Sequence, residues 1–169
     1  MKKIIVTLLA AMVMFSLVGC ESKEEKEAKI KEEVTSSVDQ FMGAVKEMDF
    51  DVANKYLSES SDKLDDNDFG NLDEDSKELV KTALNNMTYE IDSINVDSSE
   101  SANVNLTVSA MKLDLANSLY AAVTGEGMGD KSVDTNLKIV AEKGKNEDGE
   151  TTWLLNIDDG TFSNAVVNK

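Results

Sequence analysis

The feature that most constrains the fold of this chain is the strict alternation of apolar and polar residues over 102–113. Ala102, Val104, Leu106, Val108 and Ala110 alternate with Asn103, Asn105, Thr107 and Ser109. Successive side chains of a strand point to opposite faces of its sheet, so this pattern predicts one dry face and one wet face. A sheet of this kind is typically antiparallel, with helices or another layer covering the dry face.

Helical periodicity upstream of this strand supplies such a cover. The apolar residues that recur in steps of three or four predict one long amphipathic helix, and they are Ile30, Val34, Val38, Phe41, Met42, Val45 and Met48. Asp49 is placed to cap a short second helix that carries Phe50, Ala53 and Leu57. A third helix is expected over Asp75–Asn85, with a buried stripe of Leu79, Val80, Ala83 and Leu84.

Three further strands are expected around the central one. Tyr89 and Ile91 are out of phase with Ile94 and Val96, which predicts a bulge or bend near Asp92–Ser93. A strand over Val133–Lys143 should direct Val133, Leu137, Ile139 and Ala141 inward, and a turn over 144–149 should lead to a strand over Thr151–Asp158 with Trp153, Leu155 and Ile157 in one phase. Short helices are expected over Asp114–Val123, before a glycine-rich connector at 125–129, and around Phe162, Ala165 and Val166.

Helices followed by antiparallel strands predict an α+β fold, with a long N-terminal helix plus short helices packed on a curved antiparallel sheet. The segment FMGAVKEMDFDVANKYLSE at 41–59, the strand pair and the late WLLNI at 153–157 carry a resemblance. They are similar to small lipoproteins of Gram-positive bacteria that have a nuclear transport factor 2-like (cystatin-like) cone domain. The resemblance spans most of residues 34–160 and implies a fold, which does not by itself fix a function.

The N-terminus has the features of an export signal. Lys2 and Lys3 precede an apolar run over 4–18, which is shorter than the ~20 residues that a membrane-spanning helix requires. The sequence Leu17-Val18-Gly19-Cys20 resembles the lipobox of bacterial lipoproteins. That resemblance implies cleavage after Gly19 and acylation of Cys20 with lipid tails such as palmitate, and several tails would hold the protein stably on a bilayer.

The chain therefore divides into three expected parts, which are a signal peptide over 1–19, a charged tether over 20–33 and a single cone domain over 34–169. The signal holds two of the 17 lysines and no acidic residue, so the remaining 15 lysines and 33 acidic residues give a net charge of −18. Such a field repels nucleic-acid phosphates, and no nucleic-acid partner is expected. The expected location is the outer face of the cell membrane, where the lipid anchor holds an extracytoplasmic domain.

The residue inventory excludes most familiar catalytic chemistry. The chain has no histidine and no arginine, and its one cysteine is the residue to be acylated. Histidine-dependent triads and zinc sites are therefore excluded, and we expect no cofactor and no metal site. Acid-base chemistry is left to carboxylates, lysine and tyrosine, with Tyr89, Tyr120 and Asp92 as the candidates that a cone pocket would use. The alternative for these tyrosines, and for Trp153, is that they pack in or beside the core.

Two segments resemble a calcium loop and a phosphate-binding loop but lack the residues or the context that these motifs require. With Gly70 at the sixth position of a calcium loop, the fifth falls on Phe69 and the twelfth on Ser76, where a carboxylate is required, so the acidic run Asp62–Asp75 is not an EF-hand. An irregular divalent-cation site and a solvated loop both remain open for this run. The segment 125–132 has glycines and a lysine but follows a helix, so it does not aim backbone amides at a phosphate.

From these observations we expect a membrane-tethered binding or interaction module of the cell envelope, whose partner is an envelope protein or a small apolar ligand. The alternative is an enzyme of isomerase or hydrolase type that uses pocket carboxylates and tyrosine. A polar cluster in a deep pocket, with a carboxyl group of raised pKa, would favour the enzyme, whereas a filled interior and an exposed apolar patch would favour the interaction module. A third possibility is a structural or acidic surface-coat role.

Replacing the acylated residue tests the anchor directly. The variant Cys20→Ala should be released from the membrane or retain its leader, while its circular dichroism spectrum stays that of the folded domain, because the lipid makes no contact needed for folding. Fractionation and mass spectrometry would measure this. Persistence of Cys20→Ala in the lipid-modified membrane fraction would contradict the prediction.

Overall fold

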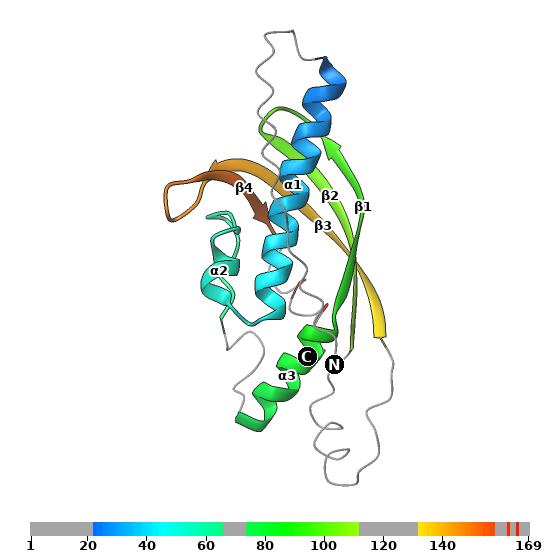
Figure 1. Ribbon diagram of the computed structural model, residues 1–169, viewed down its shortest axis with the longest axis vertical. Helices are drawn as coiled ribbons and strands as arrows, with labels where there is room; N and C mark the ends of the chain where they lie inside the picture. Colours follow the sequence, from blue (N-terminus) through cyan, green and yellow to red (C-terminus); the bar gives the residue numbers. More distant parts are fainter. Residues whose placement is uncertain (1–21, 66–73, 112–131, 158–161, 163–164, 166–169) are drawn as a thin grey trace, which may run out of the picture.

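A computed structural model describes residues 22–65, 74–111, 132–157, 162 and 165 (Figure 1). Three helices come first, α1 (Lys23–Lys46), α2 (Phe50–Asn54) and α3 (Glu74–Asn86). Four strands follow, β1 (Thr88–Val96), β2 (Ser101–Met111), β3 (Ser132–Lys145) and β4 (Thr151–Asn156). Figure 1 shows α1 lying across one face of the curved sheet, which confirms the predicted α+β class.

The sheet is an antiparallel meander in the order β1-β2-β3-β4. In β1 the register shifts between Ile91 and Ser93, so Asp92 is the extra residue of a β-bulge. This confirms the bulge predicted from the change of phase. The wet face of β2 pairs with polar residues of its neighbours, as in Asn105 with Lys138 and Thr107 with Asn136.

Helix α1 begins with a capping box, in which the Ser22 side chain accepts from the Glu25 backbone N–H and the Glu25 side chain accepts from the Ser22 N–H. It ends at Lys46, and Met48 adopts a left-handed conformation with φ of 58°. The Met48 N–H donates to Val45 O and the Asp49 N–H to Ala44 O, the two bonds of a Schellman motif. The prediction that Met48 extends the helix was therefore wrong, because the chain must reverse sharply here before α2.

The Asp49 side chain accepts from the Val52 N–H and caps α2, as predicted. Leu57 was expected on this helix but lies beyond it, where it forms a parallel bridge with Leu155. The Leu155 N–H donates to Tyr56 O and the Ser58 N–H donates to Leu155 O. Because β4 is an edge strand, the outward backbone groups of Leu155 need hydrogen-bond partners or water. The segment around Leu57 supplies these partners in an extended conformation, although the spacing of Leu57 from Ala53 is compatible with a helix.

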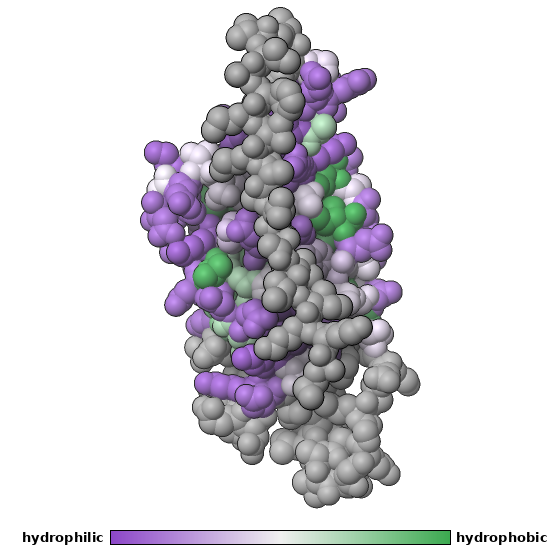
Figure 2. Space-filling model, viewed as in Figure 1, coloured by the Kyte–Doolittle hydropathy of each residue, from purple (hydrophilic) through white to green (hydrophobic). Residues whose placement is uncertain are grey.

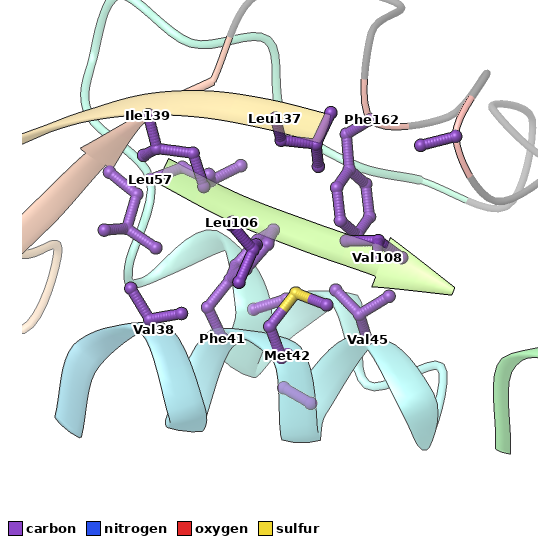
Figure 3. Close-up of a cluster of buried hydrophobic side chains, with 14 of the residues drawn as sticks. Val38, Phe41, Met42, Val45, Leu57, Leu106, Val108, Leu137, Ile139 and Phe162 are labelled. Atoms are coloured by element: carbon purple, nitrogen blue, oxygen red, sulfur yellow. The ribbon is translucent and has the colours of Figure 1, made fainter. Parts of the chain in front are cut away.

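The core fills the space between α1 and the sheet (Figure 3). Phe41, Met42 and Val45 point from α1 toward Leu106 and Val108 of β2. Phe162 packs edge-on against Phe41, with ring centroids 5.4 Å apart. The helical stripe and the alternating strand residues predicted from the sequence thus meet in one cluster.

The remaining predictions for the elements are mixed. Val80, Ala83 and Leu84 of α3 are buried as expected, and so are Phe162 and Ala165. Val133 was expected to face inward but is 36% exposed, because it is the second residue of β3 and lies at the margin of the sheet. The described residues do not include the predicted helix and connector over 114–129, nor Cys20 and Val166. Within the described ranges, none of the helices combines the length and the apolar character needed to cross a membrane.

Neighbouring residues of β3 offer a matched test of the core. Ile139 is 1% exposed and Val140 is 37% exposed on the opposite face. The substitution Ile139→Ala should lower the free energy of unfolding by about 2–5 kcal/mol, since it leaves a cavity under α1. The control Val140→Ala should cost less than about 1 kcal/mol, which is a strand-propensity effect. Urea denaturation at pH 7 measures both, and equal losses would contradict the assigned faces.

Candidate functional site

A groove of about 950 Å³ lies between α1 and the end of the sheet formed by β3 and β4. We call it the α1–β4 groove. The wall from α1 consists of Lys29, Glu32, Glu33, Ser36, Ser37 and Gln40. The opposite wall consists of Lys143, Thr151, Thr152 and Trp153.

The α1 wall follows from the same periodicity that makes the core. The residues of this wall recur in alternating steps of three and one, and so they form a second stripe beside the buried one. Each residue advances the helix by about 100°. The residues that directly precede the buried Val34, Val38 and Phe41 therefore face β4, at the edge of the sheet, instead of its centre. Packing of the core stripe therefore fixes where the groove stripe points.

Glu33 is the centre of the polar network in the groove. Its Oε2 accepts from the Trp153 indole N–H at 3.0 Å and from Lys143 Nζ at 3.0 Å. The Lys143 ammonium also lies 5.7 Å from the centroid of the Trp153 ring, within the range of a cation–π interaction. Trp153 is 2% exposed, so it is a core residue as the packing interpretation predicted, and its N–H additionally fixes a groove carboxylate.

The electrostatics keep Glu33 ionised. Partial burial opposes ionisation, but hydrogen bonds from Trp153 and Lys143, together with the charges of Lys143 and Lys29, outweigh it and lower the pKa of Glu33 below its ordinary 4.5. A general acid that works near neutral pH needs a raised pKa instead. Glu33 is therefore an ion-pairing and hydrogen-bonding group at neutral pH.

Neutral hydrogen-bonding groups continue the groove along α1. The hydroxyls of Ser37 and Thr152 lie 3.4 Å apart across it, and Ser37 is 3% exposed. Beyond them, Tyr56 donates its hydroxyl proton to Gln40 Oε1 at 2.6 Å. The groove thus offers hydroxyl and amide groups next to the charged centre.

Ion pairs join the β3–β4 turn to the segment that follows α2. Lys55 Nζ lies 2.7 Å from Asp148 Oδ2, and Lys63 Nζ lies 3.3 Å from Glu147 Oε1. In the turn, Gly149 has a φ of 80°, a conformation that glycine adopts without strain. These contacts fix the end of the hairpin from which β4 extends along the groove. The surface of the described residues is mostly hydrophilic (Figure 2).

Of the three candidates named from the sequence, the structure describes Tyr89 and Asp92, and their side chains bond to different partners. Tyr89 donates its hydroxyl proton to Asp39 Oδ1 at 2.7 Å, whereas Asp92, at the bulge, accepts from the Thr107 hydroxyl. Burial, and then the hydrogen bond and charge of Asp39, raise the pKa of Tyr89 above its ordinary 10.0, so its phenol stays protonated. Tyr120 lies outside the described residues.

Sequence reasoning missed Glu33 and Asp39 as partners. Both lie on α1, and their partners Trp153 and Tyr89 are 120 and 50 residues away in the chain. The one available signal was the placement of acidic residues next to the buried stripe, which does not identify a distant partner. Among the described residues, no three acidic, cysteine or histidine side chains converge on a metal position, and 66–73 of the acidic run lie outside them.

Comparison with solved structures provides a distant likeness. No family model and no curated protein matches the sequence. The solved structure of AclR from Streptomyces galilaeus, a proposed hydroxylase, is 15% identical, and its alignment covers 83% of this chain and 94% of that chain with a TM-score of 0.31. A likeness at this level carries no argument about the activity of this chain.

The Glu33 network predicts a pH-dependent contribution to stability. Because the folded-state pKa lies below 4.5, ionised Glu33 adds stability above pH 4.5 that is lost as the pH falls through the folded-state value. At pH 7, Glu33→Gln should cost about 1 kcal/mol, a modest value because the pair is partly exposed to solvent. The difference from the unsubstituted protein should shrink toward pH 3.

Urea denaturation at several pH values measures this difference. The neighbouring Glu32→Gln is the matched control, since no hydrogen bond or ion pair of the Glu32 side chain occurs among the described residues, and it should change stability little at any pH. A Glu33→Gln penalty that stays constant from pH 7 to pH 3 would contradict the assigned role of the carboxylate.

Proposed function

We propose that this protein is a lipoprotein, anchored through Cys20 to the outer face of the cell membrane, that binds a protein partner of the cell envelope in the α1–β4 groove. The lipobox-like sequence at Leu17–Cys20 supports the anchor. Ser22, two residues later, is the N-cap of α1. A folded body therefore follows the anchoring residue almost at once, and the charged residues of the expected tether are part of its first helix.

The observation that favours a binding function over a catalytic one is that the Glu33 carboxylate is ionised. Its carboxylate is held ionised by two donors within the protein, Trp153 and Lys143. Groups fixed in this way are preorganised to form hydrogen bonds, and they are poorly suited to take up and release a proton at neutral pH. The enzyme alternative has less support, because Tyr89 lies with Asp39 and not in the groove.

The nature of the partner follows from what surrounds the groove. The space between α1 and the sheet is occupied by packed side chains, including Phe41, Leu106 and Ile139, where a small apolar ligand of a hollow cone would sit. Nine of the ten residues that line the groove have a charged, hydroxyl or amide side chain, and the tenth is Trp153. Such a surface suits a polar polypeptide better than a small apolar molecule.

Site-specific photocrosslinking in living cells tests this function. A photoreactive phenylalanine analogue in place of Ser36, an exposed residue of the groove, should give a discrete adduct with another protein in the membrane fraction. The matched control replaces Lys138, which is exposed on the opposite face of the sheet. Absence of an adduct from position 36, or equal adducts from both positions, would contradict binding in the groove.

A further inference from the structure

The outer edge of β4 has backbone groups that face away from the sheet at known positions. At the β3–β4 turn the Asn146 N–H donates to Glu150 O at 3.0 Å, so these two residues form a hydrogen-bonded pair. Thr151 then faces Lys145, Trp153 faces Lys143 and Leu155 faces Ala141. Hydrogen-bonded and non-hydrogen-bonded pairs alternate in antiparallel ladders, so Thr151, Trp153 and Leu155 all direct their N–H and C=O away from β3.

The contacts of Leu155 confirm this assignment independently. Its N–H donates to Tyr56 O at 2.7 Å, and its C=O accepts from the Ser58 N–H at 3.0 Å and from the Ser61 hydroxyl at 3.1 Å. The protein thus covers its own edge at Leu155. The backbone pairing ends there, because in the described part of the chain no group bonds to the outward N–H or C=O of Thr151 or Trp153. Beyond them the same segment contacts the turn through side chains alone, in the Lys55–Asp148 and Lys63–Glu147 pairs.

This uncovered edge borders the α1–β4 groove. Thr151, Thr152 and Trp153 are three consecutive residues of one strand, and all three line the groove. The face of a strand presents every second residue, so a lining of consecutive residues indicates that the strand borders the groove with its edge. The unpaired backbone groups and the groove are one site.

The other edge of the sheet is protected by different means. Strand β1 contains the bulge at Asp92 and exposes the carboxylates of Glu90 and Asp92. Bulges and charges are the devices that prevent another strand from pairing with an edge. At Thr151 and Trp153 the β4 edge has neither a bulge nor a charged side chain.

We propose that an extended peptide segment of the protein partner adds to the sheet as a strand at Thr151–Trp153, alongside α1. This inference rests on the proposed binding function and specifies its mode. Strand addition would satisfy the outward backbone groups, while alternate side chains of the peptide would enter the groove. The hydroxyl and amide groups of Ser36, Gln40 and Thr152 fit small polar side chains.

Charge narrows the choice of peptide. The groove has two lysines and two glutamates, so its own charges balance, whereas the whole chain has a net charge of −16. An acidic peptide would be repelled by the field around the groove, and a basic one attracted. The expected occupant is therefore an extended segment with small polar side chains and a neutral to basic net charge.

The test selects peptides and then removes their backbone donors. A phage-displayed library of random 12-residue peptides is panned against the lipid-anchored protein in detergent micelles, and enriched peptides are synthesised. Methylation of alternate backbone nitrogens in such a peptide should weaken binding at least tenfold, because it removes ladder donors and keeps every side chain. Amide hydrogen exchange at Thr151 and Trp153 should slow when the unmethylated peptide binds.

A protein variant gives the reciprocal measurement. Thr151→Pro removes an outward N–H that takes no part in the β3–β4 ladder, so the strand should tolerate it, while Thr151→Val keeps that N–H. Thr151→Pro should weaken peptide binding at least tenfold and Thr151→Val less than threefold. If Thr151→Pro fails to fold, the methylated peptides decide the question.

Enrichment of no peptide, binding that withstands methylation, or protection of β1 amides instead of β4 amides would overturn strand addition. Self-association of the protein through this edge, seen as a dimer in light scattering that Thr151→Pro abolishes, would also overturn it. Photocrosslinks from Ser36 in cells that persist in Thr151→Pro would leave the binding function standing and refute only this mode.

Discussion

The packing of the apolar stripe of α1 against the dry face of the sheet is the contact on which the rest of this structure depends. Val34, Val38 and Phe41 are fully buried in one cluster with strand residues such as Leu106 and Ile139. Neither layer could keep its apolar side chains from water alone, since an isolated amphipathic helix and an isolated sheet each leave one face exposed. This contact also sets the rotation of α1, and thereby directs the neighbouring stripe with Glu33 and Ser37 at β4.

The polar network of the groove is a consequence of that rotation. It brings a carboxylate to the rim of the core, where partial burial is unfavourable unless donors compensate. The Trp153 N–H and the Lys143 ammonium supply that compensation to Glu33. A buried indole N–H needs an acceptor as much as the carboxylate needs donors, so the same bond satisfies both groups.

Much of the fold could be predicted from the sequence, because local periodicity determines strands, helices and their dry faces. The bulge at Asp92 and the cap at Asp49 followed from phase and residue type. The end of α1 could not be predicted, because the left-handed Met48 is imposed by the turn into α2 and is rare for a residue with a side chain. The partners of Glu33 could not be predicted either, since 110 and 120 residues separate them from it.

The capping box at Ser22 has a consequence for motion. If Cys20 is fixed at a membrane surface, only Glu21 separates it from the cap of α1, so the polypeptide between the lipid-bearing residue and the domain is very short. Lys29, the first groove residue, is then about 10 Å along the helix from the cap. Such a short linker would restrict the domain to a thin layer above the lipid. Its effective concentration would then be higher for partners that are confined to the same layer.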